Sequence, residues 1–344
     1  MSQKQILVTG GTGYIGSHTV VELQNQGYDV VIVDDLSNSD KEVIDRIEKI
    51  SGIRPHFEEL NLIDADGVNQ LFKKYTKLAA VIHFAAFKAV GESVKEPLKY
   101  YQNNLVSLIN LLNCMKAYDV PNMVFSSSCT VYGQPETLPV TENAPVQPAE
   151  SPYGNTKQIC EEILRDTVKA YPQLKAIALR YFNPVGAHKT ALIGELPKGV
   201  PQNLVPFITQ TAFGLRDQLS VFGDNYDTID GSAVRDYIHV VDLAKAHIIA
   251  AERLLNGINE ENYEYFNLGT GTGSSVLEVI NAFEKANGLP VNYKIVDRRE
   301  GDIEKIWADT TIANEVLGWK AERGLDEMMS SAWAWEKNIR EGDC

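Results

Sequence analysis

Short, mostly apolar runs alternate with amphipathic stretches through the first half of the chain. The runs are rich in β-branched residues and too short for helices, so each predicts a buried strand. They lie at residues 6–8, 30–33, 56–58, 80–83, 123–125 and 176–179. Helical periodicity fills the intervals, most clearly at residues 98–117 and 153–170. This alternation predicts an α/β fold built on a Rossmann-type, doubly wound parallel sheet.

The pattern loosens after about Asn183, where Gly, Pro and Asn become frequent and strands mix irregularly with helices. We therefore expect two domains, residues 1–182 and residues 183–344, with some segments of the second part returning to the first. The second domain should be a smaller, mixed α/β domain. It is expected to cover the carboxyl ends of the parallel strands, where open α/β sheets bind their ligands.

The first predicted strand ends in a glycine-rich turn with the spacing Gly10-x-x-Gly13-x-x-Gly16. Gly10 permits the tight turn, Gly13 lets the backbone approach a pyrophosphate, and Gly16 lets the helix pack on the strand. Asp34 ends the second strand, where a carboxylate can accept both ribose hydroxyls of an adenosine. That charge would repel a 2′-phosphate, so the pattern predicts NAD rather than NADP.

A second glycine cluster, at residues 269–273, precedes a helix that should begin at Val276. No acidic residue follows at the spacing of a dinucleotide site. We interpret the cluster as a structural turn, with Ser274 or Ser275 capping the helix.

Tyr153 and Lys157 are one turn apart on one face of a predicted helix. The hydroxyl-rich segment 126–130 follows a strand, so it should reach the same edge of the sheet. Ser, Tyr and Lys can move a proton while a nicotinamide moves a hydride. A free tyrosine has a pKa near ~10, so ionising it near neutral pH needs roughly 4 kcal/mol. One cation at ~4 Å supplies about that much. Lys157 and the positive nicotinamide ring could therefore ionise Tyr153 together.

Composition narrows the possible partners. The formal net charge of −14 argues against nucleic-acid and membrane partners, which need a basic face. The first residues lead into a strand without the apolar region of a signal peptide, and no apolar run approaches the length of a membrane span. The four cysteines form no Cys-x-x-Cys pair, and the six histidines show no metal-ligand spacing. We expect a cytoplasmic protein with free thiols and no metal.

The chain also resembles the extended short-chain dehydrogenase/reductases, and among them the UDP-glucose 4-epimerases. The most specific segments are FKAVGES at residues 87–93 and RYFNPVGAH at residues 180–188. Further matching segments are residues 9–18, 83–93, 100–104, 125–133, 234–240, 298–302 and 307–309.

The resemblance implies an enzyme, an NAD-dependent isomerase of nucleotide sugars. It would interconvert UDP-galactose and UDP-glucose by transient oxidation at sugar C4, rotation of the 4-keto intermediate and return of the hydride. Tyr153 would act as the base, with Ser128 bridging or orienting the proton and Lys157 supporting Tyr153. The resemblance also implies a homodimer, with the helices at 98–117 and 153–170 forming a shared bundle.

The resemblance assigns two sets of binding residues. The cofactor set is Gly10, Gly13, Tyr14, Ile15, Gly16, Asp34, Asn38, Ser39, Asn61, Leu62, Phe84, Ala85, Lys88, Asn103, Tyr153, Lys157 and Phe182. The substrate set is Lys88, Ser128, Thr130, Tyr153, Asn183, Asn203, Leu204, Phe222, Arg235, Arg299, Asp302 and Ile306. Within the second set, the arginines would bind the diphosphate, Phe222 would line the uracil pocket and Asp302 would bind the ribose.

Two positions depart from the family pattern. Asn61 stands where an Asp often meets the adenine amino group, and its amide oxygen can accept the same bond. Ile306 stands where a bulky Tyr guards the sugar 2-substituent in strictly glucose-specific members. Isoleucine is intermediate in size, so we expect weak or absent turnover of UDP-N-acetylgalactosamine.

Three other functions remain as alternatives. An epimerase of N-acetylated UDP-hexoses would have the same catalytic residues. A nucleotide-sugar 4,6-dehydratase would need an Asp-Glu pair where this chain has Cys129 and Thr130. An NAD-sensing binding protein would typically lack the tyrosine that is present here at position 153.

Overall fold

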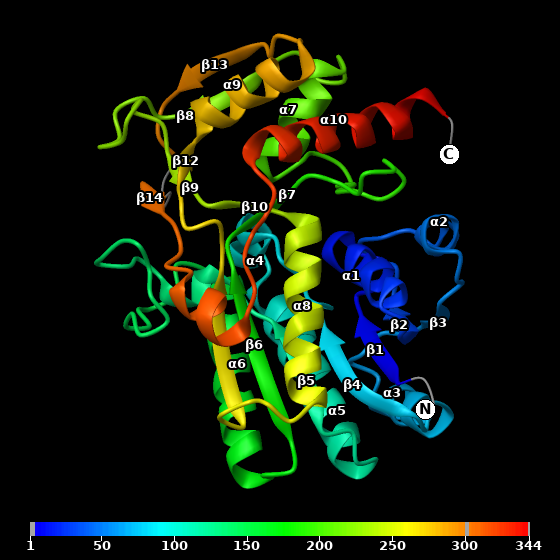
Figure 1. The fold of residues 1–344 in the computed structure, drawn as a ribbon. Coiled ribbons are helices and arrows are strands. Elements are labelled where there is room, and N and C mark those ends of the chain that lie inside the picture. The colour runs from blue at the N-terminus through cyan, green and yellow to red at the C-terminus, as the bar shows by residue number, and fades with distance from the viewer. Residues whose placement is uncertain (1–3, 300–302, 343–344) are drawn as a thin grey trace.

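The computed structural model describes residues 4–299 and 303–342, which form a lower body built on a large sheet and an upper body of helices and small sheets (Figure 1). The sheet has seven parallel strands in the order β11-β6-β5-β4-β1-β2-β3. Their bounds are β1 Gln5–Thr9, β2 Asp29–Asp34, β3 His56–Glu59, β4 Leu78–His83, β5 Asn122–Ser126, β6 Lys175–Tyr181 and β11 Tyr263–Leu268. The order reverses at β1, which confirms the predicted doubly wound α/β fold.

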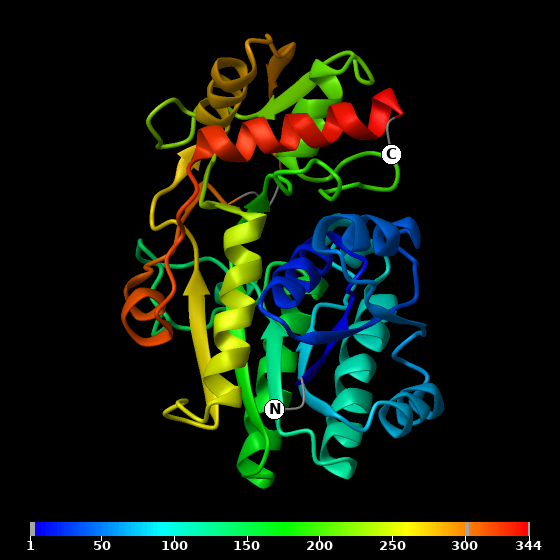
Figure 2. The ribbon, with the colours of Figure 1, turned by 45° about the vertical axis from the view of Figure 1, so that its right-hand side comes forward.

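Helices cover both faces of this sheet. One face packs against α1 (Tyr14–Asn25), α2 (Glu42–Ser51) and α8 (Val240–Leu255), and its core includes Ile6, Val20 and Leu243. The other packs against α3 (Ala65–Lys74), α5 (Pro97–Ala117) and α6 (Pro152–Ala170), with Leu7 and Leu111 in its core. Figure 2 shows α1 and α8 on the same side of the sheet. Successive residues of β1 enter opposite cores because side chains alternate along a strand.

The upper body lies beyond the carboxyl ends of the strands (Figure 1). Its core joins α7 (Leu204–Ala212), α9 (Val276–Asn287) and α10 (Leu325–Glu341). Three small sheets complete it: β7 (Asn183–Val185) with β10 (Tyr237–His239), β8 (Leu219–Phe222) with β13 (Tyr293–Val296), and β9 (Val234–Arg235) between β12 (Ser274–Ser275) and β14 (Lys305–Ile306). The short elements are α4 (Val90–Lys95), η1 (Cys129–Tyr132) and η2 (Ala313–Leu317).

Sequence position and spatial position diverge late in the chain. Strand β11 pairs with β6 in the large sheet, and α8 packs against one face of that sheet. Both elements follow elements of the upper body in the sequence. The glycine cluster at 269–273 follows β11 and is a turn, as expected. Ser275 then caps α9 in a capping box with Glu278, which confirms the predicted cap.

Two negative findings concern the described residues. No helix in the described ranges is long and apolar enough to cross a membrane. The same ranges contain no group of three or more His, Cys, Asp or Glu side chains placed to hold a metal ion.

Candidate active site

The glycine-rich turn between β1 and α1 has the close approaches that require glycine. Gly10 has φ of 69°, and a Cβ there would lie 2.8 Å from the backbone nitrogen of Ala85. A Cβ on Gly16 would lie 2.1 Å from the carbonyl oxygen of Gly10. Gly13 is the N-cap of α1 and has no side chain to cap the helix, whose first turn includes Tyr14 and Ile15. The turn therefore offers an open helix N-terminus to a pyrophosphate.

Asp34 is held in place at the end of β2. Its Oδ2 accepts a hydrogen bond from the Thr12 backbone N–H at 3.2 Å. Its Oδ1 accepts from the Leu36 N–H at 3.0 Å and from the Ser39 hydroxyl at 3.0 Å. These donors fix a carboxylate beside the glycine turn, so the geometry fits the ribose diol of a dinucleotide. Asn38 is exposed on the same loop.

The remaining cofactor candidates line the ends of neighbouring elements. Phe84 and Ala85 follow β4, and the Ala85 N–H donates to the Thr9 hydroxyl at 3.3 Å. Asn61 follows β3 and accepts from the Ile63 N–H at 3.1 Å, while its neighbour Leu62 is buried. On α5, Asn103 donates its amide to Asn104, and Phe182 is buried after β6.

The predicted catalytic residues meet at the carboxyl edge of β5. Ser151 caps α6 by accepting from the Gly154 N–H at 3.1 Å, and Pro152 is the first helical residue. This start places Tyr153 in the first turn and Lys157 one turn later on the inner face. Ser128 precedes η1, and its side chain is hydrogen-bonded to that of Tyr153.

The ionisation of this set is governed by burial. Loss of solvent raises the pKa of the Tyr153 hydroxyl, the neighbouring Tyr181 raises it further, and the bond to Ser128 lowers it. Burial also lowers the pKa of the Lys157 ammonium to about 8. Lys157 Nζ donates to the Ser126 carbonyl at 2.6 Å and lies 6.0 Å from the centroid of the Tyr153 ring. Positive charge near the Tyr153 hydroxyl would oppose the effect of burial and favour its ionisation.

Two pairs of predicted substrate residues come together in the upper body. Arg235 on β9 and Ile306 on β14 are register partners, and Ile306 is only 3% exposed, packed with Val131 and Phe182. At the end of β8, the Arg299 guanidinium lies 4.8 Å from the centroid of the Phe222 ring. A polar pocket beside this pair is lined by residues 223–225 and 295–298. Asp302 lies outside the described residues.

The amide candidates are placed by short elements. The Asn183 backbone N–H donates to the Asp236 carbonyl at 3.0 Å, which joins the starts of β7 and β10. Asn203 is the N-cap of α7, which begins at Leu204, and its amide donates to Glu195. Lys88 Nζ is 3.5 Å from the same carboxylate oxygen of Glu195. Thr130 Oγ1 is buried and has no hydrogen-bond partner within the described residues.

Comparisons with known proteins show the family to which the chain belongs. A family model described as GDP-mannose 4,6 dehydratase matches residues 7–332. The UDP-glucose 4-epimerase of Haemophilus influenzae is 51% identical over 337 residues, which cover 98% of each chain. The chain belongs to the UDP-glucose 4-epimerase family.

Two solved structures of family members are similar over almost their full length. The crystal structure of the epimerase from Stenotrophomonas maltophila, with bound NAD and formylated UDP-arabinopyranose, has a TM-score of 0.95 at 47% identity. It covers 98% of this chain and 99% of its own. The epimerase from Bifidobacterium longum, in complex with NAD+ and UDP, has a TM-score of 0.93 at 47% identity and covers 98% and 100%.

A buried ion pair lies beside the predicted catalytic residues, and sequence analysis gave it no role. Glu161 accepts from Arg180 through both carboxylate oxygens, with Nε to Oε1 at 2.9 Å and Nη2 to Oε2 at 2.5 Å. It also accepts from the Ser127 hydroxyl at 2.5 Å. Glu161 is one helical turn after Lys157, so the i, i+4 spacing on the inner face of α6 was a usable signal.

Glu195 was also missed. It is a charged residue in a loop without periodicity, and nothing in the local sequence indicates that it contacts two candidate site residues. Neither Lys88 nor Asn203 shares a helix or strand with Glu195. Only the folded chain therefore reveals these contacts.

Proposed function

We propose that the chain interconverts UDP-galactose and UDP-glucose by transient oxidation at C4, using bound NAD. The observation that carries this function is the set of Ser128, Tyr153 and Lys157 at the sheet edge that also holds the glycine turn and Asp34. Burial raises the pKa of the Cys129 thiol at this edge, and Arg235 is close enough to oppose that rise. A cation suited to a diphosphate is therefore near the residues suited to proton transfer.

The chain's own groups would move one proton in each direction. Tyr153, as a phenolate, takes the proton of the sugar 4-hydroxyl, with Ser128 orienting the two oxygens. Bound NAD, held by the glycine turn and Asp34, would supply a reversible hydride acceptor for C4, so no net oxidation would occur. The 4-keto sugar turns over while the diphosphate stays bound. Tyr153 then returns its proton to the C4 oxygen, after the hydride has reached the opposite face.

Ionisation of Tyr153 would need positive charge that the bound cofactor could supply. Burial holds the Tyr153 pKa above its ordinary value, and one N–H of Lys157 donates to the Ser126 carbonyl. The positive nicotinamide would provide the additional charge that favours the phenolate. Within the site, Tyr153 would hold the transferred proton at its hydroxyl until the proton returns to the C4 oxygen.

The substrate residues form part of the same proposal. Arg235 and Arg299 would bind the diphosphate, Phe222 the uracil, and the amides of Asn183 and Asn203 the rest of the substrate, with Asp302 on the ribose. Ile306 is packed tightly, which supports poor acceptance of an N-acetyl group. Turnover of UDP-N-acetylgalactosamine as fast as that of UDP-galactose would contradict this specificity.

A nucleotide-sugar dehydratase is the second candidate, because the matching family model bears a dehydratase description. The residues at the site do not favour it. Burial raises the pKa of the Cys129 thiol to about 12, and Thr130 cannot act as a carboxylic acid. Elimination of water needs an acid and a base at this edge, and neither residue supplies one.

Assembly and location complete the proposal. We expect a cytoplasmic homodimer in which α5 and α6 pair with their copies. Exposed apolar side chains on α5 support this, with Leu98 at 81% and Ile109 at 42% exposure. We also propose that residues 1–182 hold mainly the cofactor and residues 183–344 mainly the UDP sugar. Light scattering on the purified protein tests the dimer directly.

Proton NMR of UDP-galactose incubated with the purified protein, without added NAD, tests the activity. Appearance of UDP-glucose would support both the epimerisation and a retained cofactor. No conversion, even after NAD is added, would reject the function for this sugar. A new 4-keto-6-deoxy product would favour the dehydratase instead.

A further inference from the structure

The loop between β7 and α7, residues 186–203, connects the two halves of the cleft. It receives a hydrogen bond from the Tyr14 hydroxyl at the Gly186 carbonyl, at 2.6 Å. Lys198 Nζ donates to the carbonyls of Leu36 and Ser37, at 3.1 and 3.3 Å, in the loop after Asp34. The loop therefore contacts the first turn of α1 and the loop after β2, which are both predicted to bind the dinucleotide.

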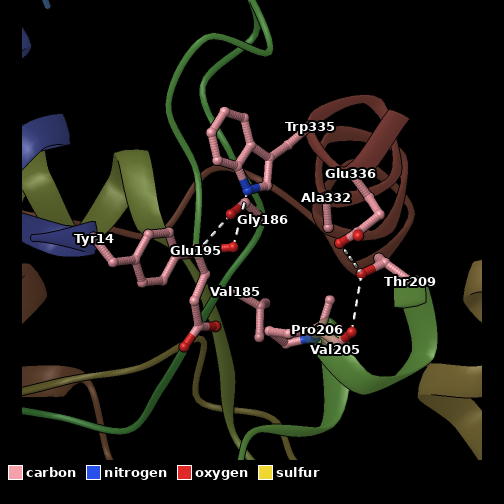
Figure 3. Close-up of a pocket in the computed structure, with 10 residues that line it drawn as sticks. All are labelled: Tyr14, Val185, Gly186, Glu195, Val205, Pro206, Thr209, Ala332, Trp335 and Glu336. Carbon is pink, nitrogen blue, oxygen red and sulfur yellow. Dashed lines mark hydrogen bonds between the residues drawn. The ribbon is translucent and has the colours of Figure 1, made fainter. Parts of the chain in front are cut away.

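The backbone at Glu195 is fixed from the opposite side by α10. The Trp335 indole N–H donates to the Glu195 carbonyl at 2.9 Å, as Figure 3 shows. Gly194 passes directly over this indole, and a Cβ at Gly194 would lie 2.4 Å from the ring. Trp335 is buried, and the Arg46 guanidinium lies 5.5 Å from its ring centroid. Packing thus determines where the Glu195 side chain begins.

That side chain extends away from Trp335, beside Tyr14 (Figure 3). Its Oε1 accepts from Asn203 Nδ2 at 2.6 Å and lies 3.5 Å from Lys88 Nζ. The Glu195 side chain is 13% exposed, whereas that of Lys88 is 50% exposed. One carboxylate oxygen therefore contacts Lys88, which belongs to both proposed binding sets, and Asn203, which belongs to the substrate set alone.

The contact with Asn203 has a consequence for α7. Asn203 is the N-cap residue, but its side chain makes no capping hydrogen bond to the helix. Asparagine normally caps well, and here the amide is directed to Glu195 instead. The carboxylate thus keeps the side chain away from the α7 N-terminus, whose N–H groups and dipole favour a phosphate.

We propose that Glu195 is a positioning residue that couples the two sides of the cleft by holding Lys88 and Asn203. This inference rests on the proposed function, because Lys88 and Asn203 take their ligands from it. With Glu195 present, the Asn203 amide is oriented before the UDP sugar arrives. Without it, Asn203 can rotate onto the helix end, and Lys88 loses its neighbouring carboxylate.

The test uses the NAD-containing enzyme, three single variants, and a double-variant cycle with Asn203→Ala. Glu195→Ala removes both contacts, whereas Glu195→Gln keeps an amide oxygen for Asn203 and removes the charge beside Lys88. Glu322→Gln is the matched control, because it removes the same charge from an exposed ion pair with Lys245 on the upper side of α8. For each protein we would measure the Kd of UDP by calorimetry, KM and kcat with UDP-galactose, NAD content and Tm.

We expect Glu195→Ala to raise the Kd of UDP and the KM about tenfold, the size of a lost hydrogen bond to a charged group. The change in kcat should stay within about threefold, and Glu195→Gln should lie between Ala and wild type. In an Asn203→Ala background, Glu195→Ala should add less than about twofold to the Kd, because its partner is already absent.

Two results would overturn the coupling. One is a Kd for UDP in Glu195→Ala within about twofold of wild type. The other is a weakened Kd that accompanies an equal loss of NAD content and a lowered Tm, which would indicate a purely structural role. A wild-type enzyme that fails to convert UDP-galactose would reject the proposed function. The UDP measurements would then still report on Glu195.

Discussion

The cofactor side and the substrate side of the cleft are built in different ways. On the cofactor side, the Gly10–Gly16 turn, Asp34 and Phe84 lie at the carboxyl ends of β1, β2 and β4, which are neighbours in the seven-stranded sheet. On the substrate side, Arg235 meets Ile306 across strands of two residues each, which join segments about 70 positions apart. A large sheet fixes one half, and a few long-range pairings fix the other.

This difference suggests how each half should respond to change. Tyr153 and Lys157 on the cofactor side are buried at the edge of the large sheet, so their substitution should act on chemistry and stability. Residues of the substrate side are held by small sheets, so their substitution should act mainly on affinity. Four substitutions test this contrast.

The largest effect is expected for Tyr153→Phe. The ring can keep its packing in the first turn of α6, but the proton-transfer group is lost. We expect kcat to fall by about 10²- to 10⁴-fold, the usual contribution of general acid–base catalysis. Bound NAD and the Kd of UDP should be close to wild type. A variant that keeps more than about a tenth of kcat would remove Tyr153 from the catalytic set.

Lys157→Met tests the cost of a buried charge on the cofactor side. The folded protein lowers the Lys157 pKa from 10.5 to about 8, so the unfolded chain holds this proton more tightly between those values. Burial therefore destabilises the wild type fully below about pH 8, and the penalty fades as the pH rises. The difference in unfolding free energy between variant and wild type should shift by on the order of 3 kcal/mol between pH 7 and pH 10.5.

Urea unfolding at several pH values measures this shift. Groups whose pKa values do not depend on Lys157 contribute equally to both proteins and drop out of the difference. A difference that stays constant with pH would mean that Lys157 keeps its ordinary pKa in the fold.

Gly16→Ala tests the close packing of the glycine turn. The added Cβ would lie 2.1 Å from the Gly10 carbonyl oxygen, so the backbone must shift. We expect a loss of about 1–3 kcal/mol in stability together with release of NAD during purification. Gly324→Ala is the control, because its added Cβ meets nothing within 4 Å. Equal behaviour of the two variants would show that the turn can relax.

The smallest effect is expected for Arg235→Lys on the substrate side. Lysine keeps the charge but loses the planar fork that binds phosphate oxygens in pairs. We expect KM for UDP-galactose to rise about tenfold, with NAD content and Tm unchanged. A fall in NAD content as large as that in Gly16→Ala would contradict the separation between a cofactor side and a substrate side.

Much of the lower body was predictable because its signals are local. The predicted strands at 30–33 and 80–83 lie within β2 and β4, and the predicted helices at 98–117 and 153–170 lie within α5 and α6. The Ser275 cap of α9 was recognisable from a hydroxyl residue before an apolar helix. In contrast, strands of two residues such as β9 and β14 have no periodicity to detect. Their candidate residues came from the family resemblance alone.

The sequence by itself determined the Rossmann-type sheet, the glycine turn, the acidic residue at the end of β2 and the spacing of Tyr153 and Lys157. These depend on neighbours within one or two turns of chain, where side-chain period and backbone sterics decide the conformation. Only the tertiary structure placed Glu161 against Arg180, Ile306 beside Arg235, and Glu195 between Lys88 and Asn203. It also decided that the Tyr153 pKa is raised, because desolvation depends on everything packed around the hydroxyl rather than on its neighbours in sequence.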